Sequence, residues 1–179
     1  MLLKEKMASE GKRFLASLMG IKLSEDPPQL NSLVPQRISN EIMSGQLPRF
    51  HPSTIMLEQG ESCHFMDRAA LVLKRKEKSY QSHRNGSGYK VSKRWTIYST
   101  NGRTTPVVQE WYEYKEGVVF VTNKRIIFIE PDSGFEKKLR NLTALIPYSD
   151  AIGLQFGGQV ITLLLPQATL MASVLRMLN

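Results

Sequence analysis

The chain has 179 residues, 41% of them hydrophobic, and a formal net charge of +8. This length and composition are typical of one globular domain and exclude a disordered or fibrous protein. A single cysteine cannot form an internal disulfide, which argues against a disulfide-stapled secreted scaffold. No apolar run approaches the roughly 18 residues of a transmembrane helix, and charges at residues 4–6 interrupt any signal-peptide core. We therefore expect a cytoplasmic protein.

The first part of the chain has a helical pattern. Apolar residues recur at helical spacing in residues 2–20 and again in residues 32–43. Ser32 can cap the second helix, and Pro35 is tolerated in its first turn. Proline-containing linkers at 23–30 and 47–52 follow the two helices. We therefore expect residues 1–52 to form a helical extension with Pro-rich linkers.

The pattern changes to short strands from Thr54 onward. We expect strands at residues 55–57, 62–78, 91–100, 107–114, 118–122, 125–129, 135–139, 142–148, 152–156 and 160–165. Residues 79–89 are predicted to form a polar loop that ends in a Gly-Ser-Gly tip. Asn101-Gly102 is the strongest two-residue turn signal in the chain. A tight hairpin after Gly117 is predicted to turn at Asn123-Lys124, because Asn tolerates the positive φ of such turns.

The last element returns to helical spacing. After Pro166 an apolar stripe is formed by Leu170, Met171, Val174, Leu175 and Leu178. A helix with such a stripe must bury it, and the preceding sheet is the available partner. The order of elements therefore predicts an α+β fold, in which a run of antiparallel strands is closed by a C-terminal helix.

The positive charge is concentrated in one part of the sequence. Residues 68–103 contain ten bases and one acid, Glu77, so this block carries +9 and the rest of the chain −1. The ten bases are the predicted partner-binding residues: Arg68, Lys74, Arg75, Lys76, Lys78, Arg84, Lys90, Lys93, Arg94 and Arg103. Such a block creates a local field that attracts anionic partners. The alternative is a solvated strand face and loop.

Residues 117–128 resemble the hairpin of GRAM domains and bacterial PH-like domains. That hairpin has the form G-x-hydrophobic-x-hydrophobic-T-N-x-R-hydrophobic-hydrophobic-F, and this chain reads GVVFVTNKRIIF. The segments at 60–65, 142–156 and 170–178 resemble the neighbouring elements of the same proteins. The resemblance implies that residues 53–179 form a PH-superfold antiparallel β-barrel or sandwich, capped by the C-terminal helix. It also implies a non-catalytic binding platform, whose relatives bind phosphoinositides, peptides or other proteins.

Enzyme and metal hypotheses find little support in the sequence. The spacing of His51, His64 and His83 fits no zinc motif. Cys63 and His64 are adjacent on a predicted strand, so their side chains point to opposite faces and cannot form a dyad. We expect Cys63 to be a small buried hydrophobe. Asn123 and Arg125 could form a ligand pair, but hairpin geometry alone explains Asn123. We expect no cofactor, no metal and no catalytic residues.

Two functional hypotheses remain. The leading one is a binding or adaptor module whose basic face engages an anionic partner, with a protein favoured over a peripheral membrane surface. The alternative is a nucleic-acid-associated protein, or an inhibitor of a host nuclease encoded by a phage or mobile element. Tyr80, Tyr89, Trp95 and Tyr98 lie among the bases, as in surfaces that stack on nucleic-acid bases. Aromatic residues on a strand are, however, commonly part of a core.

Overall fold

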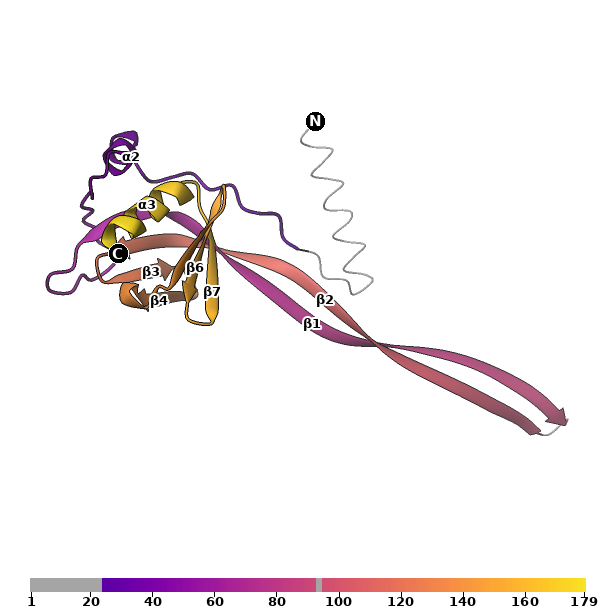
Figure 1. Cartoon of the computed structure of the whole chain (residues 1–179). Coiled ribbons are helices and arrows are strands. Elements are labelled where there is room, and N and C mark those ends of the chain that lie inside the picture. Colours follow the sequence, from indigo (N-terminus) through magenta and orange to yellow (C-terminus); the bar gives the residue numbers. More distant parts are fainter. Residues whose placement is uncertain (1–23, 93–94) are drawn as a thin grey trace, which may run out of the picture. The chain divides into compact units, whose positions relative to one another are not determined.

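The computed structural model describes residues 24–92 and 95–179 (Figure 1). The described elements are α2 (Gln36–Met43), β1 (Cys63–Ser92), β2 (Trp95–Thr122), β3 (Arg125–Ile129), β4 (Gly134–Lys138), the 3-10 helix η1 (Leu139–Asn141), β5 (Ala144–Pro147), β6 (Ala151–Phe156), β7 (Gln159–Leu164) and α3 (Ala168–Leu178). The helix predicted at residues 2–20 lies outside this range. No helix within it is long and apolar enough to cross a membrane.

The seven strands form one sheet in the order β4-β3-β2-β1-β7-β6-β5. The ladders that join β1 to β7, β2 to β3, β3 to β4, β5 to β6 and β6 to β7 are all antiparallel. Two runs of neighbouring strands are thus joined through β1 and β7, and α3 follows the last strand. This order is consistent with the PH-like fold that the resemblance implies. The outer strands β4 and β5 are not paired with each other in the described sheet, so the predicted barrel closure is not confirmed.

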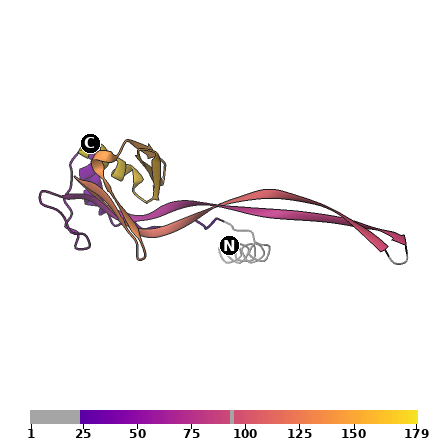
Figure 2. The ribbon, with the colours of Figure 1, turned by 90° about the horizontal axis from the view of Figure 1, so that it is seen from below.

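The chain divides into two compact units. Among the described residues, one consists of residues 24, 74–92 and 95–112, and the other of residues 25–73 and 113–179. We call the second the core unit. In the first, residues 74–92 of β1 and 95–112 of β2 form a two-stranded ribbon, which we call the basic ribbon (Figure 2).

The long strands correct three sequence predictions. The expected loop at 79–89 lies within β1, and Asn101-Gly102 lies within β2. Residues 115–117, expected to separate two strands, continue β2. The turn signal of Asn-Gly is a local preference, whereas pairing along two long strands satisfies the backbone groups of many residues. The long pairing outweighs the local signal.

The segment predicted as the first strand, residues 55–57, is not a strand. Ile55 and Leu57 are instead partly buried against a cluster of Cys63, Phe120 and Ile127. Their apolar character therefore reflects packing of an irregular segment on one face of the sheet, not ladder formation.

The second predicted helix is shorter than expected because Ser32 has another role. The helix α2 begins at Gln36, and its first turn has no side-chain cap. The Ser32 hydroxyl donates to Asp67 Oδ2 at 2.9 Å, and the Leu33 amide donates to Asp67 Oδ1 at 2.6 Å. Asp67 is fully buried, and burial is the main reason that its pKa is raised. Its carboxylate ties the segment before α2 to β1.

This segment also contributes to the main hydrophobic core. Val34 and Ile42 belong to the same buried cluster as Phe65 and Leu163. The predicted domain boundary at residue 53 remains a prediction.

The C-terminal helix is present as predicted and packs into the core. The helix α3 contacts β5, β6 and α2. Its buried residues include Met171, Val174 and Leu175, and all three belong to the main hydrophobic cluster. The apolar stripe predicted from the sequence is therefore the face of α3 that is buried in the core.

Truncation of this stripe should destabilise the core unit. Leu175→Ala removes a fully buried side chain and should lower the free energy of unfolding by about 2–5 kcal/mol. Leu178 is only partly buried, so Leu178→Ala is the matched control and should cost less. Urea denaturation measures both. Equal, small effects would contradict the packing of α3.

Candidate functional site

The structure places most of the predicted partner-binding residues on the basic ribbon. Arg68 is exposed on β1 within the core unit. Lys93 and Arg94 lie outside the described residues. The other seven lie on the ribbon strands: Lys74, Arg75, Lys76, Lys78, Arg84 and Lys90 on β1, and Arg103 on β2. The side chains of Lys74 to Lys78 are exposed.

An acid from β2 reduces this positive charge. Lys74 Nζ lies 2.6 Å and Lys76 Nζ 2.7 Å from the Glu110 carboxylate. Hydrogen bonds from Lys74 and Lys76 lower the pKa of Glu110 to about 2, so the carboxylate stays ionised near neutral pH. Two acids, Glu77 and Glu110, therefore reduce the positive charge of the basic block. Sequence reasoning missed Glu110 because it lies outside the block and reaches it only through strand pairing.

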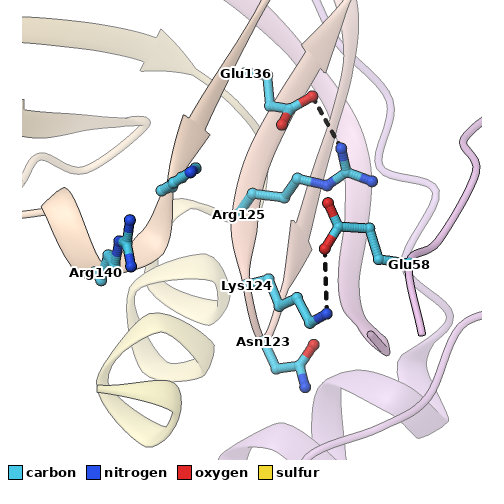
Figure 3. A pocket seen from close by; sticks show the side chains of 7 residues that line it. Glu58, Asn123, Lys124, Arg125, Glu136 and Arg140 are labelled. Carbon is cyan, nitrogen blue, oxygen red and sulfur yellow. Dashed lines mark hydrogen bonds and ion pairs between the residues drawn. The ribbon is translucent and has the colours of Figure 1, made fainter. Parts of the chain in front are cut away.

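A second group of charges lines a pocket in the core unit, with a volume of about 370 Å³ (Figure 3). Its lining residues come from the segment before β1, the β2–β3 turn, β3, β4 and η1: Glu58, Asn123, Lys124, Arg125, Glu136, Lys138 and Arg140. Lys124 Nζ lies 3.1 Å from Glu58, and Arg125 Nη1 lies 3.0 Å from Glu136. Asn123, Lys124 and Arg125 of the hairpin therefore form one wall of a charged pocket.

An ion pair behind this pocket holds the hairpin to the preceding chain. The Glu61 side chain has no exposed surface, and it accepts hydrogen bonds from Arg125 Nε at 2.9 Å and Nη2 at 3.0 Å. The Thr122 hydroxyl donates to the same carboxylate at 2.6 Å. Arg125 Nη2 also donates to the Met56 carbonyl at 2.7 Å. The segment before β1 and the β2–β3 hairpin thus meet at Arg125.

The pKa shifts of this pair show which effect dominates. Burial alone raises the pKa of Glu61, but hydrogen bonds from Arg125, the Glu58 amide and Thr122 outweigh burial and lower it. The pKa of Arg125 is raised, chiefly by its hydrogen bonds to Glu61. Both groups are therefore held in their charged forms.

Asn123 has a different role from the one predicted. No described residue other than glycine has a positive φ, so Asn123 is not required for turn geometry. Its Oδ1 accepts from the Ser62 amide at 2.9 Å, and its Nδ2 donates to the Gly60 carbonyl at 3.0 Å. Asn123 therefore fixes the turn to the segment before β1. Gly117 has the steric role in this hairpin, because a Cβ there would lie 2.2 Å from the Ile129 carbonyl oxygen.

Cys63 and His64 make separate contacts. Cys63 is fully buried, as predicted, and burial raises its thiol pKa to about 11. Its Sγ donates to the Phe65 carbonyl at 3.3 Å. The His64 Nδ1 donates to the Pro48 carbonyl at 2.8 Å. Across residues 24–92 and 95–179, no three acidic, His or Cys side chains come together as a metal-ligand set.

Comparison with known proteins places the chain in no family. No family model matches the sequence, and no curated protein does so either. Among solved structures the chain is similar to the Vps36 N-terminal PH domain, with 16% sequence identity and a TM-score of 0.39. The match covers 69% of this chain and 83% of that chain. A TM-score this low does not establish a shared fold. The GRAM-like and bacterial character, like the cytoplasmic location, remains a prediction.

Loss of the buried ion pair should destabilise the core unit. Glu61→Gln leaves Arg125 without its main counter-charge and should lower the free energy of unfolding by about 3 kcal/mol. Glu58→Gln is the matched control, because it removes an ion pair whose carboxylate side chain is 60% exposed. It should cost less than about 1 kcal/mol. Equal effects in urea denaturation would contradict the importance of burial.

The same variant should change the response to acid. A lowered carboxylate pKa stabilises the fold above the ordinary value of 4.5, and this contribution is lost as the pH falls toward the folded-state value. The Glu61→Gln variant has no carboxylate at this position, so it cannot lose this contribution to stability. We therefore expect unfolding free energy to fall less on acidification in the variant than in the wild type. Parallel pH profiles would contradict this assignment.

Proposed function

We propose that this protein is a non-catalytic binding module that engages an anionic partner through its basic ribbon. The observation that carries the proposal is the charge of the ribbon. Residues 74–112, which comprise the ribbon strands and the two residues between them, contain nine bases and two acids, Glu77 and Glu110, and therefore carry +7. Even with Glu110 paired, a large positive field remains, and it attracts anionic surfaces.

The form of the ribbon supports a role in contact with another molecule. A two-stranded ribbon is marginally stable by itself, because it lacks a second layer against which to bury an apolar face. The side chains of Lys74 to Lys78 on β1 are exposed. This part of the ribbon therefore presents its charge to solvent. An acidic protein surface or an anionic membrane surface would complement it.

A nucleic acid is the second candidate, and the two-stranded form favours it. The major groove of DNA admits a two-stranded β-ribbon, and basic side chains on such a ribbon contact phosphates. The sequence also places Tyr80, Tyr89, Trp95 and Tyr98 on the ribbon strands. Inhibition of a host nuclease remains a hypothesis that no contact in the structure favours.

Charge reversal tests the proposal directly. Three probes represent the partner classes: poly-glutamate, vesicles containing phosphatidylserine, and a short DNA duplex. Reversal of four ribbon bases to Glu should lower affinity for the preferred probe by about tenfold or more, because Coulomb attraction is lost. The four are Lys74, Arg75, Lys76 and Lys78. The matched control reverses four bases outside the ribbon and so changes net charge equally: Arg37, Arg49, Lys137 and Arg176.

Release of the paired lysines should have the opposite effect. Glu110→Gln frees Lys74 and Lys76 from their counter-charge, so affinity for the same probe should rise severalfold. DNA binding should weaken along a line in log salt, with a slope of about 0.9 per neutralised phosphate, whereas protein binding should be less sensitive to salt. If both variants bind like the wild type at every salt concentration, the ribbon is only a solvated surface.

A further inference from the structure

The pocket in the core unit contains two cations that the described chain does not neutralise. Lys138 ends β4 and Arg140 lies in η1, and both side chains are exposed. Within residues 24–92 and 95–179, neither makes an ion pair or a side-chain hydrogen bond. The other two cations of the lining, Lys124 and Arg125, are already bound to carboxylates (Figure 3).

The backbone holds both unpaired cations at the pocket. Leu139 lies between them, is 4% exposed and belongs to the main hydrophobic cluster. Its amide donates to the Lys124 carbonyl at 2.8 Å. Burial of Leu139 and this hydrogen bond fix the turn after β4 against the β2–β3 turn. Lys138 and Arg140 are therefore anchored by their neighbour, although their own side chains are exposed.

Strand register places like charges opposite each other. Lys138 is the direct cross-strand partner of Arg125 in the β3–β4 ladder. Like charges at such positions destabilise a sheet. Glu61 and Glu136 offset the charge of Arg125, but the charge of Lys138 is not offset. A bound anion would offset the charge of Lys138.

The pocket keeps a positive charge although it contains acidic residues. Glu58 is paired with Lys124, and Glu136 shares Arg125 with the buried Glu61. The seven lining residues carry four cations and two carboxylates, and with Glu61 included the net charge is +1. The volume of about 370 Å³ suits a small ligand.

We propose that this pocket binds a small dianion of the phosphate class, either inorganic phosphate or a phosphate monoester, through Lys138 and Arg140. The guanidinium presents two parallel N–H donors that match phosphate oxygens, and the ammonium adds a second positive charge. All lining residues belong to the core unit, so this site does not depend on the basic ribbon.

Calorimetric titration of the full chain with inorganic phosphate and with glycerol 3-phosphate tests the site. We expect saturable binding of at least one of them, and the two titrations distinguish a free phosphate from a monoester. The double variant Lys138→Ala/Arg140→Ala should lower affinity by about tenfold or more, because both charge-assisted contacts are lost. Lys137→Ala is the matched control. Lys137 precedes Lys138 on β4, and its Nζ donates a hydrogen bond to Gln159 Oε1. This variant should bind like the wild type.

Two further measurements keep the result unambiguous. Binding of the dianion should also raise the midpoint temperature of thermal unfolding. Sodium chloride at the same ionic strength should not raise it. If the double variant does not fold, Lys138→Gln and Arg140→Gln are tested singly, and each should weaken binding. The proposal is overturned if neither dianion binds, if chloride stabilises equally, or if a folded variant binds as tightly as the wild type.

Discussion

The core unit depends on a carboxylate that is buried and charged. Glu61 has no exposed side-chain surface, and an ionised carboxylate in that position is stable only with a counter-charge and several hydrogen bonds. Arg125, Thr122 and the Glu58 amide supply them. Because these partners come from the β2–β3 hairpin and the segment before β1, the charge fixes two distant parts of the sequence to each other. A hydrophobic contact would not specify their register as strictly.

Arg125 also connects this pair to the pocket. Its guanidinium reaches Glu61 on one side and Glu136 of β4 on the other, and the pocket lies along the same residues. The hairpin singled out by the resemblance therefore contains Arg125, the residue that connects the buried ion pair to the pocket. The core unit and the basic ribbon use positive charge differently. In the core unit the two cations of the hairpin turn, Lys124 and Arg125, are paired with carboxylates. Residues 74–112, by contrast, contain nine bases and only two acids.

Much of the core unit could be predicted from the sequence, because its elements are short and strongly patterned. Periodicity predicts the strands after residue 117 and the apolar stripe of α3. The position of the turn at Asn123-Lys124 was also predicted, but Asn123 fixes it through side-chain hydrogen bonds and not through a positive φ. The ribbon could not be predicted, since its glycines and its Asn-Gly pair are turn signals that long-range strand pairing overrides. The pairing of Glu110 with Lys74 and Lys76 was missed for the same reason. The buried contacts of Asp67 and Glu61 could not be predicted, because their partners are distant in sequence.

We propose that the macromolecular partner binds the basic ribbon, whereas the pocket of the core unit takes only a small dianion. Replacement of residues 75–111 by Asn-Gly removes most of the ribbon and keeps all residues of the core unit. Affinity of this shortened chain for the probe that the full chain prefers is the most direct measurement, with circular dichroism to confirm that the core unit still unfolds cooperatively. We predict that the shortened chain folds and loses binding. A folded, shortened chain that binds as tightly as the full chain would contradict the account.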